Sequence, residues 1–177
     1  MRTALAVLIA GVWPSCLAQS DAQSIEHKVK AAYLYKFASY VEWPAKAFER
    51  PDSPIAIGVA GASPMAEELA LVVTDRNVDG RKVIIHRVPN GESVAGLHML
   101  FVGRSAPRAA DLLAAAKGKP VLTITESEEA FGLGSIINLV MVEDKVRFDV
   151  ALRPAEQNNL KVSSRLLGVA RKVVGAS

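Results

Sequence analysis

The sequence predicts an α/β protein with an open, mainly parallel sheet of about six strands, helices on both faces and an antiparallel hairpin at one edge. Short β-branched apolar runs alternate with helical patterns from residue 55 onward. Two strand-to-helix junctions, at residues 61–64 and 103–107, share glycine, serine and proline. Two later apolar runs are separated only by Glu143 and Asp144, which is typical of a hairpin. We expect the strand order 2-1-3-4-5-6.

We expect the first helix in the segment from Val29 to Pro44, which reads VKAAYLYKFASYVEWP. Proline lacks the N–H group that a continuing helix needs, and it disfavours helical angles in the residue before it. Trp43 and Pro44 are therefore expected to end the helix. At about 3.6 residues per turn, one face carries aromatic and valine side chains: Val29, Tyr33, Phe37, Tyr40 and Val41.

The remaining elements are expected in alternation along the chain. Ser63 is a good helix N-cap and Pro64 suits the first helical position, so a helix should cover residues 65–73. Gly118 should end a third helix over residues 108–117. A short helix or turn is expected over residues 126–131 and a last helix from about 163 to 174. The expected strands cover residues 55–60, 81–88, 97–102, 120–124, 135–142 and 145–152.

The N-terminus has the features of a secretory signal peptide over residues 1–18. Arg2 precedes an apolar stretch over residues 4–12, which is far shorter than the roughly 20 residues that span a bilayer. Cleavage is expected after Ala18, with Ala22 as the second choice, so that residues 19–177 form a single exported domain. Lipidation of Cys16 is the alternative, although the residues before it do not match a lipoprotein signal.

Composition argues against several functional classes. Without the signal, 20 basic and 18 acidic residues are dispersed along the chain, so nucleic-acid binding is not expected. Cys16 is the only cysteine and would be lost with the signal. Thiol catalysis, iron–sulfur chemistry and disulfide switching are then excluded.

No catalytic, cofactor-binding or metal-binding residues are expected. His27, His86 and His98 fall in different elements, and none has a close-spaced partner of the kind that holds a metal. The sequence around Ser63 lacks the second glycine of a nucleophile elbow, and the glycine-containing turns do not form a nucleotide-binding loop. We therefore expect no enzyme activity.

A small-ligand receptor is one functional hypothesis. Open α/β sheets bind ligands beyond the carboxyl ends of the strands where the strand order reverses, here between the first and third strands. Ser63, Arg104 and Ser105 lie at the two junctions that would meet there. Free helix N–H groups and the Arg104 cation could hold an anion. The alternative is that these junctions only cap helices.

A protein-binding surface is the second hypothesis. Tyr33, Tyr40 and Trp43 are typical interface anchors, although the same side chains could pack in the core. If residues 145–152 form the sheet edge, Arg147 and Asp149 lie on its solvated face. The free backbone groups of such an edge could pair with another chain, or the charges could protect the edge from pairing. A homodimer is left open.

The order of these segments resembles the YfiR-like family. The first helix with its Trp-Pro and the stretch from VRFDVAL to SSRLL are the most specific landmarks. The resemblance covers residues 28–174 and includes PIAIGVAG, GRKVIIHRV, LHMLFVGRS, VLTITES, FGLGSIINLVMVEDKVRFDVAL and LKVSSRLLGVARKV.

The resemblance implies a periplasmic regulator without catalysis of its own. Such proteins bind the periplasmic sensor domain of an inner-membrane diguanylate cyclase and hold it inactive, which limits cyclic di-GMP and biofilm formation. An outer-membrane lipoprotein can sequester the regulator and release the cyclase. Related sequences often carry cysteine at the position of His98, so the redox control ascribed to some of them is not expected here.

Overall fold

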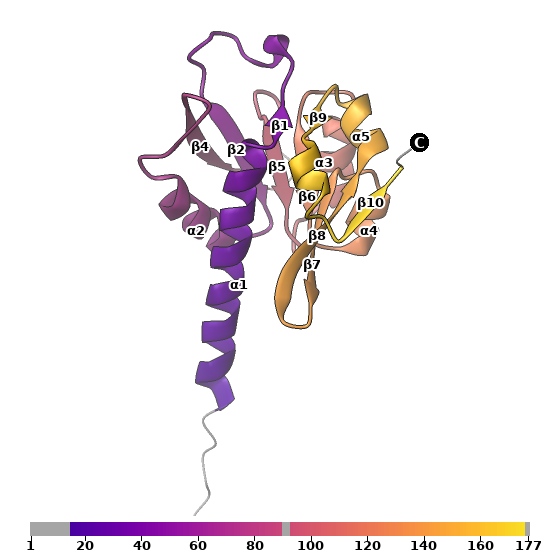
Figure 1. Ribbon diagram of the computed structural model, residues 1–177. Helices are drawn as coiled ribbons and strands as arrows, with labels where there is room; N and C mark the ends of the chain where they lie inside the picture. Colours follow the sequence, from indigo (N-terminus) through magenta and orange to yellow (C-terminus); the bar gives the residue numbers. More distant parts are fainter. Residues whose placement is uncertain (1–14, 90–92, 176–177) are drawn as a thin grey trace, which may run out of the picture.

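A mixed eight-stranded sheet forms the centre of the computed structural model, which describes residues 15–89 and 93–175. Residues 1–14 of the expected signal peptide lie outside the described residues, so that assignment stays a prediction. The sheet has the order β10-β8-β7-β6-β5-β2-β4-β3 (Figure 1). Its strands are β2 (Ile55–Ala60), β3 (Asn77–Val78), β4 (Arg81–Arg87), β5 (Met99–Val102), β6 (Leu122–Thr125), β7 (Ile137–Val142), β8 (Lys145–Ala151) and β10 (Lys172–Val174).

The six strands expected from the sequence follow one another as β4-β2-β5-β6-β7-β8, in the predicted order. Neighbours from β4 to β7 pair in parallel, whereas β7 and β8 form an antiparallel hairpin. Every residue of β2 is buried, as expected of a central parallel strand that is covered on both faces. The predicted α/β class is confirmed.

Two short strands extend this sheet beyond the predicted six. β3 pairs antiparallel with the start of β4 through a turn of Asp79 and Gly80, both at positive φ. β10 pairs in parallel with β8 from Asp149 to Ala151, so the prediction that the hairpin forms the sheet edge is wrong. The predicted last helix over residues 163–174 is also wrong. The observed helix covers only Ser164–Leu167, and the chain then enters β10.

Helices cover both faces of the sheet, as predicted. The aliphatic and aromatic side chains of α1 and α2 pack on one face against Ile57 and Phe101, and those of α3 pack on the other against Leu100 and Val102. The helices are α1 (Ser15–Ala38), the 3-10 turn η1 (Ala45–Ala47), α2 (Ser63–Val73), α3 (Ala109–Ala116), α4 (Glu128–Gly132), α5 (Leu152–Gln157) and α6 (Ser164–Leu167).

The first helix ends at Ala38, before the Trp43 and Pro44 stop that the sequence predicts. Residues Val41 and Glu42 form the short strand β1, which pairs antiparallel with β9 (Lys161–Val162). Next to this pair, the Ser163 N–H donates to the Tyr40 carbonyl at 2.9 Å. These pairings with a segment more than a hundred residues away replace the last turn of helix that local sequence would allow.

The N-terminal half of α1 extends beyond the body of the sheet, in the same direction as the hairpin of β7 and β8 (Figure 1). Among the described residues, none of the helices combines the length and the hydrophobicity that a membrane span needs. The helix and the hairpin extend from the same side of the sheet, and the candidate site lies between them.

Candidate functional site

The two glycine-containing junctions meet at the carboxyl ends of β2 and β5, where the strand order reverses. The Gly103 N–H donates to the Ala60 carbonyl at 2.9 Å. A Cβ atom on Gly61 would lie 2.2 Å from the backbone of Ala106, and one on Gly103 would lie 2.8 Å from the Ala62 methyl group. The two junctions therefore pack directly against each other.

Arg104 is held by Glu126 at the end of β6. The Arg104 backbone N–H donates to Glu126 Oε1 at 2.9 Å, and Arg104 Nε donates to the Glu126 carbonyl at 3.0 Å. Glu126 Oε2 accepts from Lys30, which is buried on α1 and also pairs with Glu26. This network ties α1 to the carboxyl ends of the strands and favours a structural role for Arg104.

Ser63 and Ser105 are exposed and do not share a pocket with Arg104. Ser63 is the first residue of α2, and Ala62 takes the N-cap position without a side-chain hydrogen bond, so the predicted serine cap is wrong. A cavity of about 150 Å³ beside Ser63 opens toward Arg87 of β4 instead. The residues predicted to form a ligand crevice therefore lie at one end of the sheet without converging on a common space.

The aromatic face of α1 packs mainly inside the fold. Phe37 is fully buried, and its ring centre lies 5.1 Å from that of Phe148 on β8. Tyr33 completes the cluster, 5.7 Å from Phe37 and 5.6 Å from Phe148. Edge-to-face contacts of this kind stabilise a core beyond the area that they bury. Tyr33 is thus half-buried in the core cluster instead of standing free on a surface.

Tyr40 and Trp43 are also half-buried and fixed by the surrounding fold. Tyr40 lies two residues after the end of α1, and its carbonyl accepts the bond from Ser163. Trp43 Nε1 donates to the His98 carbonyl at 3.2 Å. Both side chains pack against the core and keep part of their surface exposed, so a role at an interface stays a prediction.

Asp149 does not lie on a solvated face of β8, which corrects the alternation predicted for that strand. Its side chain is only 2% exposed and it accepts two hydrogen bonds from Arg171. Arg147, two residues earlier, is exposed as predicted. The difference arises because β10 covers β8 from Asp149 onward and leaves the hairpin tip open.

A groove between α1 and the β7–β8 hairpin combines exposed apolar side chains with charged ones. It has a volume of about 540 Å³ and contains Arg147 of the predicted partner surface. We call this feature the α1–hairpin groove. It is lined by Ala22, Gln23, Ile25, Glu26, Val29, Met141, Asp144, Lys145, Val146 and Arg147.

Exposed apolar side chains make the α1–hairpin groove unusual. Ile25 is 62% exposed, Val29 38% and Met141 39%. Charged side chains of Glu26, Asp144, Lys145 and Arg147 surround them. An apolar centre with a charged rim is the arrangement of a protein-binding surface.

Sequence reasoning missed Ile25 and Met141 for two reasons. Ile25 precedes the segment read as the first helix, and Met141 was assigned to an ordinary hairpin strand. The spacing of Ile25 and Val29, four residues apart on one helix face, was the signal that could have revealed the exposed stripe.

His98 connects the segment after α1 to the sheet. Its Nδ1 accepts a hydrogen bond from the Ala56 N–H at 3.1 Å, so the proton lies on Nε2, 3.1 Å from the Ala47 carbonyl. The ring stacks on Phe48 at 4.4 Å. Burial lowers the pKa of His98 below its ordinary value, the bond to Ala47 opposes this effect, and the nearby Arg81 cation lowers the pKa further. His98 therefore fits a neutral, structural imidazole.

Metal binding has no support in the described part of the chain, where no three His, Cys, Asp or Glu side chains lie close enough together to hold an ion. His86 is exposed on β4 and His27 lies on α1.

The fold and this groove define an α/β protein with an apolar surface exposed between a long helix and a hairpin. The chain belongs to the YfiR/HmsC-like family, whose model matches residues 27–171. No curated protein matches the chain. The match covers every strand of the sheet except β10, and it begins within the part of α1 that lines the groove.

Proposed function

We propose that the protein is a periplasmic regulator that binds the periplasmic domain of an inner-membrane diguanylate cyclase and holds the enzyme inactive. The family match over residues 27–171 is the observation that carries this proposal. Cyclic di-GMP synthesis and biofilm formation then fall when the regulator is free. The regulator acts by binding, without a catalytic group, metal or cofactor of its own.

The α1–hairpin groove is the proposed contact with the cyclase. Ile25, Val29 and Met141 expose apolar area that a partner would cover, and Arg147 and Lys145 supply charge at the rim. Buried apolar anchors inside a polar rim usually contribute most of the affinity of an interface. The groove contains residues from α1, β7, β8 and the turn between the two strands, so its shape depends on the docking of α1 against the hairpin.

An outer-membrane lipoprotein is the second proposed partner. Its role would be to sequester the regulator and so release the cyclase. To release the cyclase, the lipoprotein must either bind the same groove as the cyclase or bind elsewhere and change access to the groove. Competition between the two partners for one groove is the simpler arrangement, because it needs no conformational change.

The proposal is tested by complementing a deletion strain and measuring cellular cyclic di-GMP. Deletion should raise cyclic di-GMP, and the wild-type chain should restore the low level. A chain with Ile25→Asp and Met141→Asp should fail to restore it, since each substitution places a charge in the apolar centre of the groove. Leu71→Asp is the matched control, because Leu71 is 72% exposed on α2 outside the groove.

Two outcomes would contradict the proposal. An unchanged cyclic di-GMP level in the deletion strain would oppose the repressor function. Full complementation by the double variant, at the same protein level as wild type, would keep the function and reject the groove as its contact.

A further inference from the structure

The outer edge of β4 is only partly covered by β3. The two strands pair at Val78 with Arg81 and at Asn77 with Lys82, and no further. From Val83 to Arg87, β4 pairs with β2 on its inner side. This surface shares no lining residue with the α1–hairpin groove, and the inference goes beyond the proposed function.

Backbone direction identifies the open groups on this edge. The Val88 N–H donates to the Val59 carbonyl of β2 at 2.9 Å. Successive residues of a strand direct their N–H and C=O groups to alternate sides. Those of Ile84 and His86 therefore face β2, and those of Ile85 and Arg87 face away from it. Within residues 15–89 and 93–175, no strand accepts or donates at these outward groups.

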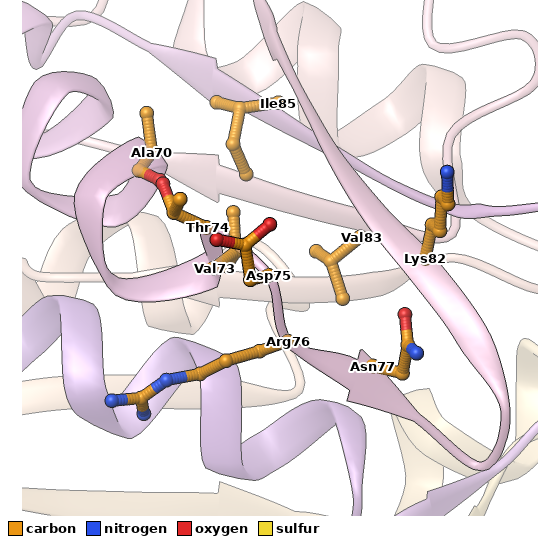
Figure 2. A pocket seen from close by; sticks show the side chains of 9 residues that line it. All are labelled: Ala70, Val73, Thr74, Asp75, Arg76, Asn77, Lys82, Val83 and Ile85. Carbon is orange, nitrogen blue, oxygen red and sulfur yellow. The ribbon is translucent and has the colours of Figure 1, made fainter.

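A groove follows this open edge. It has a volume of about 580 Å³ and lies between β4 and the C-terminal end of α2. Figure 2 shows Val73, Val83 and Ile85 between the helix and the strand, with Lys82 at one end. We call this feature the β4 edge groove. Its lining residues are Ala70, Val73, Thr74, Asp75, Arg76, Asn77, Lys82, Val83 and Ile85.

The two faces of the edge strand differ in chemistry. Val83 and Ile85 belong to the apolar layer that α1 and α2 cover. Lys82 and His86 are exposed, and Ile84 between them is 38% exposed. Because side chains alternate along a strand, these three lie on the opposite face from Val83 and Ile85. A strand added here would place apolar side chains beside the groove and its other side chains beside Lys82 and His86.

Charge argues against a second copy of this chain as the occupant. β4 carries four basic or titratable residues, namely Arg81, Lys82, His86 and Arg87, and no acidic residue. A second β4 strand would bring no acidic side chain to Lys82 and His86 and would add positive charge to the same edge, so it offers no charge complementarity. Acidic side chains on an added strand would instead pair with Lys82 and His86.

From these observations we propose that β4 binds an extended segment of a partner protein in which apolar and acidic residues alternate. The segment adds a strand to the sheet, with backbone hydrogen bonds to Ile85 and Arg87. Main-chain bonds supply affinity in this mode of recognition, and alternate side-chain contacts supply specificity. About five residues of partner fit the open length of the strand.

The test uses a synthetic heptapeptide, EVEVEVE, and amide hydrogen exchange of the full exported chain followed by NMR. In the free protein the Ile85 and Arg87 amides should exchange fast, whereas those of Ile84 and His86 should be protected. The peptide should slow exchange at Ile85 and Arg87 at least about tenfold. The peptide KVKVKVK should leave exchange unchanged, since it has the same β propensity and the opposite charge.

Two variants locate the site. Ile85→Pro removes an outward N–H and leaves the inner bonds to β2 intact, so it should weaken binding of EVEVEVE at least about tenfold. Lys82→Glu leaves the backbone groups of the edge unchanged and should weaken binding of EVEVEVE, because it places a negative charge beside the acidic peptide. This variant provides a second test if the proline variant unfolds. Lys117→Glu, at the end of α3, is the control and should bind as wild type does.

Three results would overturn the inference. The first is no saturable binding of EVEVEVE up to about 1 mM. The second is peptide binding without slower amide exchange at Ile85 and Arg87, which would show that the peptide binds through surface charge and adds no strand. The third is protection of the same amides without peptide, increasing with protein concentration. This result would show that a second copy of the chain, and not a partner segment, pairs with β4.

Discussion

Arg171 binds the carboxylate of Asp149 through two nitrogens, with Nε 2.8 Å from Oδ1 and Nη2 in contact with Oδ2. Asp149 is buried, whereas the Arg171 side chain is 40% exposed. The hydrogen bond to Asp149 raises the pKa of the Arg171 guanidinium. The pair lies where β10 joins β8, and it holds the C-terminal strand on the sheet.

We predict that Arg171→Ala destabilises the fold by about 2–3 kcal/mol. The reason is that the substitution leaves a buried carboxylate without its partner, while the partial exposure of the pair keeps the loss below that of a fully buried one. The measurement is urea unfolding at neutral pH. Arg165→Ala, at an exposed position of α6, is the matched control. Equal stability of the two variants would show that the ion pair does not anchor β10.

His98 makes stability depend on pH. Its pKa is lowered in the folded state, mainly by burial, so the unfolded chain binds a proton more readily. As pH falls below about 6.5, the unfolded state gains protons first and the free energy of unfolding decreases. The loss continues until pH reaches the folded-state pKa and then levels off. Its slope is at most about 1.4 kcal/mol per pH unit for one histidine.

The check is urea unfolding between pH 7.5 and 5 for the wild type and His98→Asn. The asparagine oxygen can accept the Ala56 N–H bond and does not titrate, so this variant should show a weaker pH dependence. His86→Asn, at an exposed position, should retain the wild-type dependence. If His98→Asn and wild type lose stability in parallel, other groups control the response.

Gly61 should tolerate no side chain. A Cβ atom would meet the Ala106 backbone at 2.2 Å, and the residue has a φ of +64°. Gly80→Ala is the matched control, since Gly80 also has positive φ and no atom lies within 4 Å of its added Cβ. The control should lose about 1–2 kcal/mol through backbone strain alone. Gly61→Ala should lose clearly more in thermal or urea unfolding, and equal losses would mean that the two junctions are not close-packed.

The central sheet could be predicted because its signals are local. β2 and β5 are short runs of buried, apolar residues, each followed by a glycine-containing turn, and right-handed crossovers restrict how such strands are ordered. The two short edge strands could not be predicted in this way. β10 has three residues, and its position depends on Arg171 meeting Asp149, a contact between segments 22 residues apart.

The candidate site was harder to predict than the fold. The Gly61 and Gly103 junctions do come together, but their sequences do not reveal that Ala62 and Ala106 fill the space between them. The aromatic face of α1 was recognised, although its partner Phe148 lies on a strand more than a hundred residues later. The spacing of Ile25 and Val29 could indicate an apolar stripe on the helix, but the sequence does not reveal that Met141 lies across from it, because the groove forms only when α1 docks on the hairpin.

The most direct test of the proposed function is the affinity of purified residues 19–177 for the purified periplasmic domain of a co-encoded membrane diguanylate cyclase, measured by isothermal titration calorimetry. We predict saturable binding by the wild type and by Leu71→Asp. The double variant Ile25→Asp with Met141→Asp should bind at least about tenfold more weakly, a loss of about 1.4 kcal/mol or more. Absence of binding by the folded wild-type chain, or equal binding by the double variant, would contradict the account.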